Sequence, residues 1–132
     1  MPEPQYIESA VSAALLESAD VAALCGERVF AVKVPPGVPL PVLVFQRIST
    51  QPDETLAGYS SESVVLAVKA FALDYEEAKQ TALAVRAALS APPLSGRLRD
   101  EVDLFDKIES EEGVYCIHAE YVFQQNGGYC YA

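Results

Sequence analysis

Cys116 and His118 are the residue pair in this sequence that most suggests nucleophilic chemistry, and His118 is the only histidine. A thiol and an imidazole act together when the base lies within hydrogen-bond reach of the sulfur. The run from Val114 to Phe123 is predicted to be a strand, and residues two apart on a strand point the same way, roughly 7 Å from each other. That separation is too long for direct proton transfer. We therefore interpret the pair as ordinary sheet residues and predict no catalytic residue here.

Metal binding is not predicted either. A Cys-x-His pair supplies two ligands where structural zinc needs four, and Cys25 and Cys130 stand at no ligand spacing. The segment from Asp100 to Glu112 is rich in carboxylates, but it lacks the Asp-x-Asp-x-Asp-Gly order of a calcium loop. We interpret it as an acidic strand that faces solvent or a cavity, and we predict no metal site and no cofactor.

The remaining chemical motifs are also incomplete. Gly96 and the Gly127-Gly128 pair stand at no strand-to-helix junction, so a phosphate-binding loop is not expected. The serines near Ser61 lack the Gly-x-Ser-x-Gly frame of a hydrolase. The sequence therefore predicts a protein that works through its surfaces and is not an enzyme.

Two main helices are predicted. Between Glu3 and Ser18, apolar residues recur at helical spacing, and a short turn that Asp20 could cap follows and ends at Gly26. Asp74 is predicted to cap the second main helix, which ends before Pro92-Pro93. Its expected core stripe consists of Tyr75, Ala78, Ala82, Val85 and Leu89.

Four longer segments are predicted to be strands, and Arg28 to Phe30 is a brief fifth candidate. The four are Val42–Ile48, Glu62–Leu73, Arg99–Ile108 and Val114–Phe123. The run Glu62–Leu73 is apolar on both alternating sets, which is typical of a strand inside a sheet or an assembly. We predict an α+β fold in which an antiparallel sheet of about four strands packs against two main helices. Residues 1–132 form a single domain, and residues 124–132 are expected to be an irregular tail.

The segment from Ser49 to Ser61 is predicted to be a long polar loop. It is longer than a hairpin needs, and it carries the apolar residues Leu56 and Tyr59. Such a segment is typical of a docking arm. We therefore predict an assembly interface that includes Asp53, Glu54, Leu56 and Tyr59.

Composition narrows the class of function. With 132 residues, 51% of them hydrophobic, the chain is long enough for one domain with a real core. Its formal net charge of −10 disfavours binding to phosphate backbones or anionic lipid. No apolar run reaches membrane-spanning length, and the acidic start Met1-Pro2-Glu3-Pro4 is unlike a signal peptide. Three cysteines, an odd number, favour free thiols in a reducing cytoplasm.

The order of these elements resembles the tail-completion, or tail-terminator, family of long-tailed bacteriophages and of related particles such as gene transfer agents. The resemblance covers most of the chain and rests on patterns of residue type rather than on a catalytic motif. It lies in Asp20–Leu24, Arg28–Phe30, Pro36, Pro41–Ile48, the Asp53–Gly58 loop, the strand through Phe71, Tyr75–Lys79, Val85–Leu89 and the return strand from Gly113 to Phe123. The Ala91-Pro92-Pro93 helix end and the tail after Gln124 depart from the pattern.

The resemblance implies a structural virion protein that forms a hexameric ring, ends the tail tube and joins it to the head connector or stopper protein. Its partners would be its own copies, the tail tube protein and the connector, with DNA passing through without specific binding and no membrane involved. The protein would reside in the tail or neck of the virion after assembly in the bacterial cytoplasm. The carboxylates expected to face the lumen of such a ring are Asp100, Glu101, Asp103 and Asp106.

Two other classes of function remain open at this point. One is a small-ligand-binding or enzymatic α+β domain whose pocket forms at a subunit interface, with Tyr115, Tyr121 and His118 as polar groups. The other is a different structural protein of the neck or baseplate. Electron microscopy of the purified protein distinguishes rings with a central hole from compact dimers with a closed pocket.

Overall fold

The computed structural model describes residues 7–54, 60–92, 94–106 and 114–126. Side chains are described within these ranges except at residues 52–54, 60–62, 104–106 and 125–126. The elements, in chain order, are α1 (Ile7–Glu17), α2 (Ala19–Cys25), β1 (Val29–Ala31), β2 (Val42–Glu54), β3 (Ser60–Ala72), α3 (Tyr75–Ser90), β4 (Arg97–Asp106) and β5 (Val114–Asn126). The predicted α+β class is confirmed.

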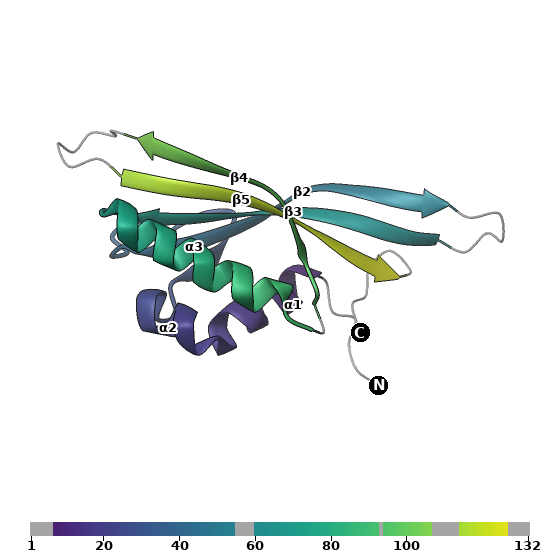
Figure 1. Cartoon of the computed structure of the whole chain (residues 1–132), viewed down its shortest axis with the longest axis horizontal. Helices are drawn as coiled ribbons and strands as arrows, with labels where there is room; N and C mark the ends of the chain where they lie inside the picture. Colours follow the sequence, from purple (N-terminus) through teal and green to yellow (C-terminus); the bar gives the residue numbers. More distant parts are fainter. Residues whose placement is uncertain (1–6, 55–59, 93, 107–113, 127–132) are drawn as a thin grey trace.

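One sheet organises the molecule, with the strand order β1-β2-β3-β5-β4. Strand β1 pairs with β2 in parallel, and every other neighbouring pair is antiparallel. The three helices all lie on one face of this sheet (Figure 1). The prediction of about four strands and two main helices is therefore low by one of each. The three-residue β1 and the seven-residue α2 are too short to give a strong periodic signal.

The core lies between the helices and the sheet. Alternate residues of the central strands point toward the helices, and they are fully buried at Leu66, Tyr121 and Phe123. Helix α1 contributes Ile7, Val11 and Leu15 to the same core cluster, as its spacing predicts. On the opposite face of β3, Val65 and Ala67 are also buried, with exposures of 3% and 1%. The prediction that β3 is apolar on both faces is thus confirmed.

The buried residues of helix α3 are Ala78, Thr81, Ala82, Ala84, Val85 and Leu89. Four of the five predicted stripe residues are among them, but Tyr75 is wrong: it is 42% exposed. Tyr75 is the first helical residue, and its hydroxyl donates a hydrogen bond to Asp103 at the surface instead. Asp74 occupies the N-cap position without a side-chain hydrogen bond, and α2 is capped by Ser18 rather than by Asp20.

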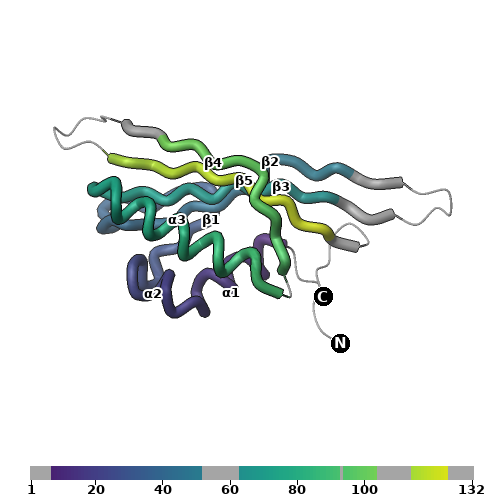
Figure 2. The backbone as a smooth tube through the Cα atoms, viewed as in Figure 1, coloured from purple at the N-terminus to yellow at the C-terminus, as the bar shows by residue number. Residues whose placement is uncertain are grey.

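The long polar loop predicted from Ser49 to Ser61 is mostly strand. Strand β2 continues to Glu54 and β3 begins at Ser60, so a hairpin leads outward from the body. A register shift between Arg47 and Ser49 precedes the extension, and Figure 2 shows this end of the sheet reaching beyond the helices. Without helices to pack on, both faces of the extension can be polar, which removes the apolar alternation that marks a strand. Strand β5 also continues through Asn126 into the segment expected to be irregular, and residues 127–132 lie outside the described part.

Candidate assembly surfaces

The carboxylates predicted to gather along β4 are divided between the two faces of the sheet. Asp100 lies opposite Glu120, whereas Glu101 and Asp103 lie opposite Ala119 and Ile117, whose side chains face the helices. The alternation of side chains along the strand causes this division, and a register shift between Leu98 and Asp100 decides which face each carboxylate takes. Asp106 ends the strand, and its side chain lies outside the described part. Asp100, Glu101 and Asp103 are all exposed, but they do not form a single acidic cluster.

Asp103 instead joins β4 to the start of α3. Its carboxylate accepts a hydrogen bond of 2.7 Å from the Tyr75 hydroxyl and forms an ion pair of 3.1 Å with the Lys79 ammonium. The same ammonium lies 5.5 Å from the centre of the Tyr75 ring. The hydrogen bonds from Tyr75 and then Lys79 lower the pKa of Asp103, and the reciprocal bond to Asp103 raises the pKa of Lys79. We interpret this surface cluster as structural.

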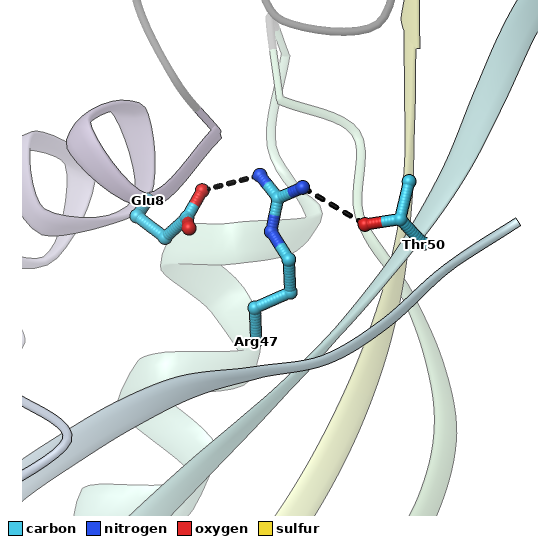
Figure 3. A network of polar contacts seen from close by, with 3 residues as sticks. All are labelled: Glu8, Arg47 and Thr50. Carbon is cyan, nitrogen blue, oxygen red and sulfur yellow. Dashed lines mark hydrogen bonds and ion pairs between the residues drawn. The ribbon is translucent and has the colours of Figure 1, made fainter.

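A second polar network fixes the base of the β2–β3 extension, and no local sequence pattern could have revealed it. The Arg47 guanidinium donates hydrogen bonds to Glu8 of α1 at 2.6 Å and to Thr50 of β2 at 2.9 Å (Figure 3). Arg47 stands next to the register shift, and the Arg47 and Glu8 side chains are 26% and 36% exposed. The network therefore ties the strand to α1 at the point where β2 leaves the body.

His118 lies on the sheet face opposite the helices, as the strand prediction requires. Its Nε2 lies 3.2 Å from a carboxylate oxygen of Glu120, and its backbone position pairs with Lys69 of β3. Cys116 and Cys25 are both buried, and burial raises the pKa of the Cys25 thiol to about 11. Among the described residues, no group of three or more His, Cys, Asp or Glu side chains is placed to hold a metal ion.

The three polar groups of the ligand-binding alternative do not converge within the chain. Tyr121 is fully buried on the helix side of the sheet, and its hydroxyl has no hydrogen-bond partner among the described residues. Burial raises the pKa of this hydroxyl, so it stays protonated. Tyr115 packs against the α3 side, whereas His118 belongs to the opposite face.

Only part of the predicted assembly loop can be placed. Asp53 and Glu54 lie in β2, opposite Ser61 and Ser60 of β3. Leu56 and Tyr59 lie outside the described residues. This arm, defined here as the segment from Ser49 to Ser61, remains a predicted interface.

The sequence did not point to a groove on the outer side of the helices. One open cavity of about 430 Å³ lies between α2 and α3, lined by Asp20, Ala23, Leu24, Gln80, Leu83, Ala84 and Ala87. A second, of about 370 Å³, lies along α1 and the end of α3 and shares Ala87 with the first. Leu83 is 62% exposed at its edge. None of the described helices is both long enough and apolar enough to span a membrane.

Comparison with known proteins identifies the kind of molecule that this fold belongs to. Residues 9–110 match the family described as "Tail completion protein gp17". The fold is similar to a chain in the solved "Virion of native gene transfer agent (GTA) particle", with 25% sequence identity and a TM-score of 0.65. That match covers 92% of this chain and 96% of the other. No curated protein sequence matches.

The comparisons identify the family of the chain. The family match begins within α1 and continues through β4, so it includes nearly all of the helix layer and four of the five strands. It confirms the resemblance inferred from the sequence, including the gene-transfer-agent relatives. The chain belongs to the tail-completion protein family, whose members are structural proteins of phage-like tails and not enzymes.

Proposed function

We propose that this protein forms a ring at the head-proximal end of a tail tube, stops the addition of further tube subunits and joins the tail to the head connector. The observation that carries this proposal is the match of residues 9–110 to tail-completion proteins. The fold similarity to a chain of a gene transfer agent virion supports it. A ring at this position has copies of itself, the tail tube protein and the connector or stopper protein as partners.

The charge of the chain is compatible with a position on the path of DNA. A net charge of −10 per copy repels a phosphate backbone, so DNA can pass without being held. We propose a hexameric ring that is assembled in the bacterial cytoplasm and retained in the virion neck. The number of subunits and the cellular site of assembly belong to the proposal.

Removal of the gene from its particle tests the proposed role. We expect heads and tails that fail to join, and tail tubes whose lengths vary because nothing stops polymerisation. Electron microscopy of the lysate measures both properties. Tails of normal length attached to filled heads would contradict the proposal.

The same experiment separates two structural alternatives. A baseplate protein would leave tails joined to heads but defective at the distal end, whereas a connecting protein of the neck would leave free tails of normal length. The ligand-binding alternative has less support because Tyr115, Tyr121 and His118 do not lie together within one chain.

A further inference from the structure

The end of β1 presents an unusual exposed residue. Val32 has a positive φ of 65°, which is sterically unfavourable for a β-branched side chain. Its N–H donates a hydrogen bond to the carbonyl of Phe45, and its side chain is 64% exposed. Because most of this side chain is exposed, burial inside its own subunit does little to offset the unfavourable backbone conformation. Its exposure suggests a role outside the subunit.

Lys33 directly follows Val32 and is also exposed. It makes no ion pair with any residue that the structure describes. The other exposed large apolar residues are Leu16, Ile48, Leu73, Tyr75, Leu83 and Val102. Of these, Ile48 adjoins Arg47, which is held by Glu8 and Thr50, and Tyr75 lies beside the Lys79 ammonium, which is paired with Asp103. Val32 and Lys33 therefore form an apolar tip with an available positive charge, which we call the β1 knob.

The groove between α2 and α3 has the opposite character. Leu24, Leu83 and Ala87 give it an apolar lining, and Asp20 places a carboxylate at its edge. Glu17 lines the adjoining cavity, so the charged residue that lines each of the two cavities is negative. An occupant that fits this groove brings an apolar side chain beside a cation.

We propose that the β1 knob of one copy docks into the α2–α3 groove of the next copy, with Val32 against Leu83 and Ala87 and with Lys33 toward Asp20. This inference rests on the proposed ring. Knob and groove are different surfaces of the same chain, so the contact is heterologous, which is the type that generates rings. A self-contact through one shared surface would give a closed dimer instead.

Val32→Asn is the most informative variant, because asparagine adopts positive φ more readily than valine. The variant should keep or increase the thermal stability of the monomer while it removes the apolar tip. We expect the protein concentration at half-assembly to rise about tenfold, as the loss of a buried valine side chain implies. Sedimentation velocity over a protein dilution series measures this concentration. The series is run at about 0.1 M salt, because charges about 10 Å apart still interact at that ionic strength.

Charge reversal tests the second half of the contact. Lys33→Glu and Asp20→Lys should each weaken assembly, and the double variant should recover part of the loss because it restores an opposite pair. Leu73→Asn is the matched control: Leu73 is 51% exposed but lines neither cavity, so its replacement should leave assembly unchanged.

These experiments test the knob-and-groove contact separately from the proposed ring. Wild-type rings that persist unchanged in Val32→Asn, or a double charge reversal that assembles no better than the single variants, would overturn the knob-and-groove contact and leave the ring intact. A loss of rings in Leu73→Asn as large as in Val32→Asn would also overturn it. Wild-type protein that forms no ring on its own or on purified tails would instead overturn the proposed ring.

Discussion

The Arg47 side chain illustrates how one residue can connect distant parts of this fold. Its Nε is buried without a hydrogen-bond partner among the described residues, and its two terminal nitrogens bind Glu8 and Thr50. A partly buried guanidinium that loses its carboxylate keeps the cost of desolvation without the compensating bond. Glu8 therefore contributes to the stability of the fold by compensating the charge of Arg47 rather than through its own packing.

We expect Glu8→Ala to lower the free energy of unfolding by about 1 kcal/mol, since the pair is only partly exposed. Arg47→Met should lower the free energy of unfolding by a similar amount. The double variant should lower it by less than the sum of the two single changes. Urea denaturation of all four proteins gives this coupling. Additive losses would show that the Glu8–Arg47 contact does not contribute to stability.

Asp103 gives a prediction that depends on pH. Its pKa is lowered from the ordinary 3.8, first by the Tyr75 hydroxyl and then by Lys79. A carboxyl whose folded-state pKa is depressed stabilises the fold above its unfolded-state pKa, and it loses that contribution as pH falls through the folded-state value. The stability advantage of wild type over Asp103→Asn should therefore be present at neutral pH, begin to decline near about pH 4 and vanish only below the folded-state pKa.

The Tyr75→Phe variant isolates the principal cause of this shift. Without the hydroxyl, the pKa of Asp103 should rise toward its ordinary value, and an NMR titration of the carboxyl carbon would show the change. Because the side chains of the Lys79–Asp103 pair are 39% and 41% exposed, solvent screens the pair and its contribution to stability is small. An unchanged pKa in Tyr75→Phe would mean that Lys79 alone sets the shift.

At the scale of the elements, the sequence predicts best where at least one face of a helix or strand is buried. The spacing of Ile7, Val11 and Leu15 locates α1, and the two apolar sets of β3 locate the central strand. The register shift after Arg47 and the paired polar ends of β2 and β3 have no such signature, so a strand was interpreted as a loop. Neither the groove beside α2 nor the Arg47 network could be predicted, because each joins residues far apart in the chain.

The extended β2–β3 hairpin changes how the arm is expected to act. The pairing of β2 with β3 continues to Glu54 and Ser60, so the described part of the arm is a paired hairpin rather than the loop that the sequence predicts. We predict that Leu56→Asp together with Tyr59→Ser preserves the fold of the monomer but weakens ring formation or docking on the tail tube.

Two measurements check the arm. Circular dichroism should show the same melting temperature for the variant and wild type, and co-sedimentation with purified tail tubes should show weaker binding. Gln124→Ala, which removes the side-chain hydrogen bond to Ser63 at the base of the arm, is a control for general effects on this hairpin. Normal assembly of the double variant, with equal protease sensitivity of the segment in monomer and ring, would rule out the arm as an interface.

At the scale of the whole molecule, charge opposes assembly. Six copies with a net charge of −10 would bring 60 formal negative charges into one ring. Salt screens this repulsion, because the Debye length falls from about 10 Å at 0.1 M to about 3 Å at 1 M. The proposed Lys33–Asp20 pair has the opposite salt dependence, but an exposed pair contributes about 1 kcal/mol at most.

We therefore expect the ring population to rise with sodium chloride. Within one subunit, Asp100 lies on the opposite face of the sheet from Glu101 and Asp103, and Asp103 is paired with Lys79. These carboxylates therefore do not form a site that could bind magnesium within one subunit. Magnesium chloride and sodium chloride should thus act alike when compared at equal ionic strength, and Asp100→Asn should not change that equivalence. Sedimentation velocity over both salt series makes the comparison. Rings that dissociate steadily as salt rises would show interfaces dominated by ion pairs. Magnesium that promotes assembly at a far lower ionic strength than sodium, with an effect that Asp100→Asn abolishes, would show that carboxylates of neighbouring copies share a bound divalent ion.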